Sequence, residues 1–162
     1  MTLRREIRRV GLTILSLALL AGLTAGAWRG YVYLTEVPPG HRRVDFYWLA
    51  KQEPRLVNGQ YVMSEELLAL DGKRIFVKGY MFPMEQMRDL TSFVLGENEK
   101  TGSSYGPELK ISDLILVQMT GGKTANHHEM VPVGVAGTFR LKPKVDGDRL
   151  VGLFILEATH FQ

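Results

Sequence analysis

The stretch of residues 70–83, LDGKRIFVKGYMFP, constrains the fold more tightly than any other part of this sequence. Asp71-Gly72 is a turn signal, and the apolar residues Ile75 and Val77 that follow it share one face of an extended chain. Gly79 then allows the strand to bend, and the apolar residues after it end at Pro83. This pattern predicts a β-strand that opens a small barrel or sandwich.

Four further segments carry strand patterns, and they cover residues 90–95, 113–119, 130–141 and 150–161. The run 113–119 is almost continuously apolar, which predicts a strand buried on both faces. Gly134 and Gly137 predict a bend or a bulge, and Asp146-Gly147-Asp148 predicts a hairpin turn. Five strands with little helix indicate a mainly β domain, a small OB-like five-stranded barrel or sandwich.

Two short helical segments are expected ahead of these strands. Residues 44–50 place Phe46 and Leu49 on one face of a short amphipathic helix that could dock on the domain. Within it, Trp48 is expected to pack against the domain rather than to stack on a ligand. Ser64 has the right side chain to cap one further helical turn.

An uncharged apolar segment near the N-terminus predicts a transmembrane helix over residues 10–28. Its nineteen residues, at about 1.5 Å each, would span about 28 Å, close to the hydrocarbon thickness of a bilayer. The residues expected to orient it are basic on the cytoplasmic side and aromatic at the far interface, namely Arg4, Arg5, Arg8, Arg9, Trp28, Tyr31 and Tyr33. The protein would therefore be a single-pass protein of the cytoplasmic membrane, with its N-terminus inside.

A cleavable signal peptide is the alternative for the same segment. Ala25-Gly26-Ala27 has the small-x-small form of a cleavage site, and the residues before it form an acceptable apolar region. Either interpretation exports the rest of the chain. Small residues at Ala18, Gly22 and Gly26 would also allow two membrane helices to self-associate, although such residues are common in membrane helices in general.

The segment boundaries follow from these patterns. We expect a cytoplasmic basic tail over 1–9, the membrane helix or signal peptide over 10–28, a linker over 29–43 and an exported β-domain over 44–162. Pro38-Pro39-Gly40 supports the linker, because this sequence cannot continue a helix.

Charge and cysteine content exclude several classes of function. The net charge is +3, and the first nine residues hold four arginines and one glutamate, so the rest of the chain sums to +3 − 3 = 0. A neutral domain lacks the basic surface that nucleic acid requires, so no nucleic-acid partner is expected. The chain contains no cysteine, which excludes disulfides, thiolate metal sites, a cysteine nucleophile and lipid attachment at an N-terminal cysteine.

Several phrases of the sequence together resemble a known family. They are LDGKRIFVKGYMFP at 70–83, FVLG at 93–96, SSYGPELKISDLILVQM at 103–119 and PVGVAGTFRL at 132–141. In this order they resemble the bacterial envelope proteins grouped as domain of unknown function 3299. The resemblance covers the chain from about Asp45 to the C-terminus and implies an envelope location and association with other envelope components. It implies no reaction.

This chain departs from the family at one position that bears on chemistry. Where the family pattern has a pair of cysteines, this sequence has Ser103-Ser104, followed by Tyr105. Serine hydroxyls are poor ligands for soft metals and cannot act as thiolates. Either the pair is structural in relatives, or this chain is a divergent, non-catalytic member. Ser103, Ser104 and Tyr105 are the predicted partner contacts in this loop.

Histidine is the remaining residue type with metal-binding potential. His127 and His128 are adjacent, with His160 distant in sequence. Adjacent residues of a strand point to opposite faces, so His127 and His128 are weak candidates for binding one ion together, and His160 is a weak third. The preferred interpretation is an exposed polar loop, with no metal and no cofactor.

No enzymatic constellation is present in the sequence. Gly121-Gly122-Lys123-Thr124 resembles the end of a phosphate-binding loop, but Val117 stands where the motif needs glycine. No oriented histidine or G-x-S-x-G elbow accompanies a serine. We therefore expect a non-enzymatic, membrane-anchored binding or scaffold domain that acts as an accessory component of an envelope complex. The alternative is metal or small-ligand handling at the envelope.

Overall fold

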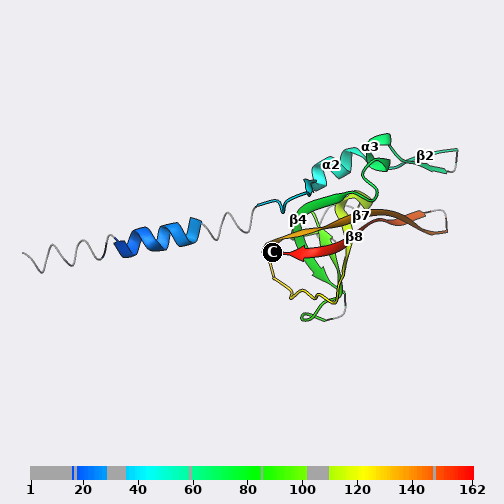
Figure 1. Cartoon of the computed structure of the whole chain (residues 1–162). Coiled ribbons are helices and arrows are strands. Elements are labelled where there is room, and N and C mark those ends of the chain that lie inside the picture. Colours follow the sequence, from blue (N-terminus) through cyan, green and yellow to red (C-terminus); the bar gives the residue numbers. More distant parts are fainter. Residues whose placement is uncertain are drawn as a thin grey trace, which may run out of the picture. The chain divides into compact units, whose positions relative to one another are not determined.

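The computed structural model describes residues 16, 18–28, 36–58, 60–84, 86–101, 110–147 and 149–162. It divides the chain into two compact units, Met1–Glu36 and Val37–Gln162 (Figure 1). Residues 18–28 of the first unit are helical. Among the described residues, no helix combines the length and the apolar character needed to cross a membrane. Residues 10–15 and 17 of the predicted span lie outside the described part.

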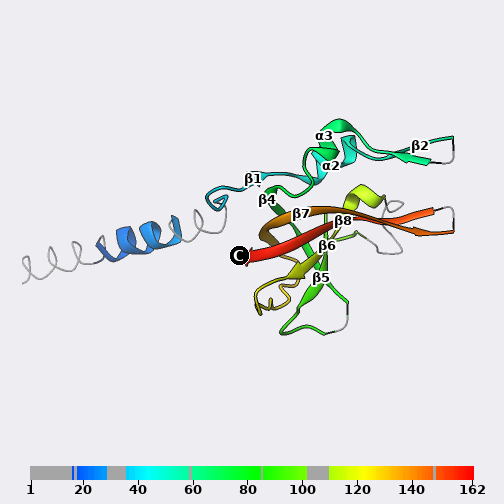
Figure 2. The same ribbon diagram turned by 45° about the vertical axis from the view of Figure 1, so that its right-hand side comes forward.

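The second unit is built around a closed barrel of five strands. Its elements are β1 (Arg42–Arg43), α2 (Phe46–Lys51), β2 (Arg55–Val57), β3 (Gln60–Val62), α3 (Glu65–Leu68), β4 (Arg74–Pro83), β5 (Ser92–Gly96), η1 (Ile111–Asp113), β6 (Leu114–Met119), β7 (Pro132–Asp146) and β8 (Arg149–Phe161). The barrel runs β4-β5-β6-β8-β7 and closes through β7 onto β4. Only β6 and β8 pair in parallel within this ring (Figure 2). The prediction of a mainly β, five-stranded domain is confirmed.

The barrel interior is apolar and tightly covered. Phe93 and Phe139 are fully buried, and the Phe139 ring lies 5.5 Å from that of Phe154. On β6, Ile115 and Val117 face this core, whereas Leu114, Leu116 and Met119 are partly exposed and Gln118 is exposed. The expectation that this strand is buried on both faces is therefore wrong, because a closed barrel has a single interior.

Glycines of β7 lie where the strands approach most closely. The pairing of β7 with β8 slips between Ala136 and Gly137, so a bulge forms at the predicted position. A Cβ at Gly137 would lie 2.1 Å from the Glu157 carbonyl oxygen. At Gly134 a Cβ would lie 2.7 Å from the Phe76 ring. Both positions require a residue without a side chain.

Both expected short helices form, and each has a side chain that caps its N-terminus. The Trp48 amide donates to the Asp45 carboxylate at 2.7 Å, and α2 buries Phe46 and Leu49 against the barrel. The Leu67 amide donates to the Ser64 hydroxyl at 3.1 Å and begins α3. Trp48 packs against the core, as expected. Each cap satisfies one of the free backbone amides at the start of its helix.

Two elements were not anticipated. The strands β2 and β3 form an antiparallel hairpin in which Val57 pairs with Gln60. The sequence Asn58-Gly59 between the two strands is a strong hairpin signal. Asn58 has a φ of 51°, the left-handed conformation that this turn requires. The strand β1 lies in the expected linker and pairs in parallel with β4.

Candidate functional site

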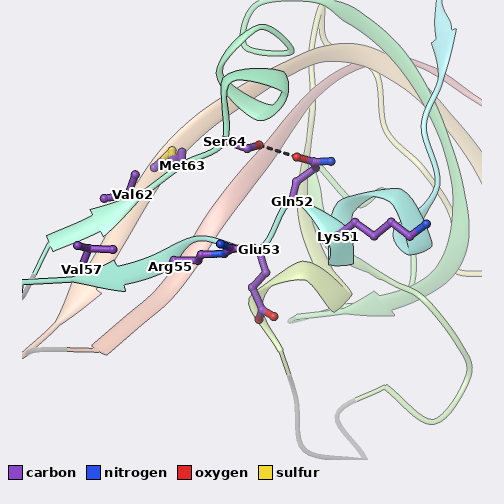
Figure 3. Close-up of a pocket in the computed structure, with 8 residues that line it drawn as sticks. All are labelled: Lys51, Gln52, Glu53, Arg55, Val57, Val62, Met63 and Ser64. Atoms are coloured by element: carbon purple, nitrogen blue, oxygen red, sulfur yellow. Dashed lines mark hydrogen bonds between the residues drawn. The ribbon is translucent and has the colours of Figure 1, made fainter.

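The hairpin β2–β3 creates the larger of two candidate binding cavities. This cavity, called here the hairpin groove, has a volume of about 430 Å³. It lies between the end of α2, the hairpin and the residue that caps α3 (Figure 3). Its lining combines apolar, charged and amide side chains, namely Lys51, Gln52, Glu53, Arg55, Val57, Val62, Met63 and Ser64.

Strand alternation explains which hairpin residues reach the groove. Leu56 is paired with Tyr61, so these two side chains share one face of the hairpin. The Tyr61 hydroxyl accepts a hydrogen bond from the Leu150 amide of β8, which directs Tyr61 toward the barrel, while Leu56 on the same face stays 60% exposed. Val57 and Val62 lie on the opposite face and are 48% and 52% exposed. The groove therefore has an apolar wall that the domain itself does not cover.

Polar contacts hold the base of the groove. The Ser64 hydroxyl donates to the Gln52 side-chain oxygen at 2.5 Å, and Figure 3 shows these two side chains pointing toward each other. The Lys51 ammonium lies 4.2 Å from the centre of the Tyr47 ring. Its side chain extends away from the hairpin in Figure 3. The rim thus carries two cations, Lys51 and Arg55, and one anion, Glu53.

The two strands of the hairpin form a sheet of their own. Within the described part of the chain, β2 pairs with β3 alone, so each strand keeps one unpaired backbone edge. The hairpin projects beside the β7–β8 hairpin in both views (Figures 1 and 2). An isolated two-stranded sheet is marginally stable, and an added strand would stabilise it.

A second, smaller cavity lies where β4 separates from β7. The two strands are paired as far as Tyr80 and Pro132, and beyond that point β4 pairs with β5. The resulting opening has a volume of about 240 Å³ and is called here the methionine pocket. Its lining includes Tyr80, Met81, Met87, His127, Glu129 and Met130.

Two loops that are far apart in sequence build this pocket. Leu90 and Ala125 exchange two backbone hydrogen bonds, at 2.8 and 3.0 Å. The His127 amide donates to the Met87 carbonyl oxygen at 2.9 Å, which continues the same antiparallel contact. The loop after β4 and the loop before β7 are thereby held side by side, with Met87 and His127 in register.

The three candidate histidines have different surroundings. His127 lines the methionine pocket, whereas the His128 ring lies 5.9 Å from that of Phe161. His160 contacts Thr159 at 2.9 Å and lies 6.0 Å, ring to ring, from His41. No group of three or more histidine, aspartate or glutamate side chains that could hold a metal occurs among the residues described.

Other predicted site residues fall partly outside the described structure. The partner contacts Ser103, Ser104 and Tyr105 lie outside it, as do the predicted membrane residues Arg4, Arg5, Arg8, Arg9, Tyr31 and Tyr33. Trp28 is described, and its side chain is 69% exposed. The small residues Ala18, Gly22 and Gly26 are helical and exposed, and a Cβ added at either glycine would meet no atom within 4 Å.

Comparison with known proteins gives matches among solved structures. No family model matches the sequence, and no curated protein matches it. The chain is similar to the crystal structure of a DUF3299 family protein from Pseudomonas aeruginosa PAO1, with 16% sequence identity and a TM-score of 0.48. The match covers 75% of this chain and 94% of that one. The resemblance expected from the sequence and this distant structural match name the same family.

Proposed function

We propose that this chain is a membrane-anchored, exported binding or scaffold protein whose hairpin groove docks an extended segment of an envelope protein. The single observation that carries the proposal is the exposed apolar wall, Val57 and Val62, on a two-stranded sheet with unpaired edges. A peptide that adds as a strand gains backbone hydrogen bonds at the edge and side-chain contacts in the cavity.

The lining of the groove defines the segment that it fits. Val57 and Val62 form the apolar wall, Met63 adds a further apolar side chain, and the charged lining residues are two cations and one anion. We therefore expect an extended segment with alternating apolar side chains and at least one acidic residue near Arg55. An accessory protein of an envelope complex would use such a contact to hold its partner outside the membrane.

We propose that the barrel is of the OB type. Numbered from β4, its strands follow the order 1-2-3-5-4 and return to the first strand.

The proposed anchor is the apolar segment 10–28, with the N-terminus in the cytoplasm. A C-terminal alkaline phosphatase fusion should be active and a cytosolic reporter fusion inactive. The opposite result would contradict the topology, and the mass of the mature chain distinguishes an anchor from a cleaved signal peptide.

Site-specific photo-crosslinking tests the docking proposal. A photoreactive residue replaces Val62 in the groove of the full-length chain and, as a matched control, Val151 on β8. The two valines have equal exposure, 52% each. We expect a discrete crosslinked envelope protein from position 62 and none from position 151. Equal crosslinking from both positions, or none from either, would reject the groove as the docking surface.

Charge substitutions give a second test. V57D/V62D should abolish co-purification of the crosslinked protein, because the docked segment would have to bury unpaired carboxylates on the apolar wall. V145D/V151D places the same charges on the neighbouring hairpin, where Val145 and Val151 are 53% and 52% exposed. Retention of the partner by the first variant, or its loss from both, would contradict the proposal. Thermal unfolding verifies that both variants fold.

A further inference from the structure

The methionine pocket concentrates thioether groups in an unusual way. Met81 lines its inner wall and is 3% exposed, while Met87 and Met130 line its mouth at 61% and 72% exposure. Met84, on the same loop as Met87, is 53% exposed. In contrast, Met63 and Met119 are partly buried against the core. Two of the three exposed methionines of the described chain therefore line this one pocket.

One polar atom of the pocket lacks a partner. The Nδ1 atom of His127 is buried and makes no hydrogen bond within the described structure. Buried polar atoms are normally satisfied, so this imidazole nitrogen is available as a donor atom for a species bound in the pocket. The backbone hydrogen bond from His127 to Met87 holds together two residues that both line the pocket.

We propose that the methionine pocket binds a soft monovalent metal ion, Cu(I), through the thioether sulfurs of Met87 and Met130 and the Nδ1 atom of His127. Thioether sulfur selects Cu(I) over the harder divalent ions, and imidazole is an accepted second ligand type. Thiolates are absent because the chain has no cysteine. The carboxylates of Glu99 and Glu129 line the same pocket and would offset the charge of the cation.

The donor set discriminates against zinc. Zinc sites use cysteine, histidine and carboxylate ligands, usually four in structural sites and three in catalytic ones. The described side chains offer no group of three histidine or carboxylate ligands for it. The site is independent of the hairpin groove, because the two cavities share no lining residue. Failure of one proposal therefore leaves the other standing.

Metal titration of the full-length chain in mild detergent tests the site. Cu(I) is added with a chromophoric Cu(I) competitor under reducing conditions, and Ag(I) serves as a redox-inert probe. We expect one ion per chain and weakening by at least about tenfold in M87L/M130L, since two of three ligands are lost. The matched control M63L/M119L replaces two methionines outside the pocket and should bind within about twofold of wild type.

Two further measurements separate ligation from folding effects. With methyl-labelled methionine, Ag(I) should shift the NMR signals of Met87 and Met130 and leave those of Met63 and Met119 in place. H127Q should weaken binding, whereas H160Q should not. The proposal is overturned if no stoichiometric Cu(I) or Ag(I) binding occurs, if Zn(II) binds as tightly, or if the control variants weaken binding equally.

Discussion

The backbone amide of Leu150 donates a hydrogen bond to the hydroxyl oxygen of Tyr61, at 3.1 Å, across 89 positions of sequence. This contact joins the β2–β3 hairpin to the start of β8, and Tyr61 also packs against the core. Leu150 is 7% exposed, so its amide lies in a largely dry environment. The relative position of the two hairpins, and with it the outward face of the hairpin groove, depends on this bond.

We expect Y61F to lower the free energy of unfolding by about 1 kcal/mol, the usual value of one hydrogen bond that leaves a donor unsatisfied. The Leu150 amide should also exchange its hydrogen faster in the variant. Y47F is the matched control, because Tyr47 is 68% exposed and its ring contact with Lys51 does not need the hydroxyl. Equal stability of Y61F and wild type would show that packing alone holds the hairpin.

The bulge in β7 predicts a strong contrast between two glycines. In G137A the new Cβ would lie 2.1 Å from the Glu157 carbonyl oxygen, and backbone cannot move aside as a side chain can. We expect a loss of about 3 kcal/mol in unfolding free energy, measured by chemical denaturation. In G152A, on β8, the Cβ would meet only the Lys144 Cβ, at 3.8 Å. Its stability should stay within about 1 kcal/mol of wild type, and similar losses in both variants would contradict the steric argument.

Local pattern predicted the fold well because each barrel strand carries its own signal. Alternating apolar residues and turn dipeptides marked all five strands, and Gly137 marked the bulge. The ends were less accurate: β7 begins at Pro132 and continues to Asp146, beyond the predicted segment 130–141. Residues after position 141 are exposed, so their extended conformation depends on pairing with β8 and leaves no apolar pattern.

The candidate sites were harder to predict, because each depends on elements that meet only in the fold. His127 was identified as a possible ligand, but its partners were sought among the other histidines. The contact between His127 and Met87 spans two loops that no local pattern connects. The hairpin groove could have been anticipated from Asn58-Gly59, which marks the β2–β3 turn. The role of Val57 and Val62 depends on which way the side chain of Tyr61 points, and only the folded structure shows this.

The N-cap of α2 should control how firmly that helix packs. In D45A the Trp48 amide loses its acceptor at 2.7 Å, and we expect unfolding free energy to fall by about 1 kcal/mol. D45S is the matched control, because serine is an equally good capping residue and should restore most of the loss. If D45S is as unstable as D45A, the carboxylate acts through its charge rather than through the cap.

The contact of Gly134 with Phe76 predicts a specific energetic coupling on the outer face of the barrel. Phe76 is 1% exposed, and a Cβ at Gly134 would lie 2.7 Å from two atoms of its ring. Gln162 closes the same region, because it exchanges two backbone hydrogen bonds with Gly134, at 2.8 and 2.9 Å. G134A should therefore destabilise the domain by forcing the ring outward, toward a position that the C-terminal residue already fills.

A double-mutant cycle measures this coupling. F76L alone should also destabilise, because leucine leaves part of the ring space empty. In G134A/F76L the new methyl group occupies that space, so the double variant should be more stable than the sum of the single effects by about 1 kcal/mol or more. Additive losses would show that the ring does not press on Gly134. G121A combined with F76L is the control, since a Cβ at Gly121 has no atom within 4 Å. The cost of G121A comes from its φ of 68°, so the losses from G121A and F76L should add.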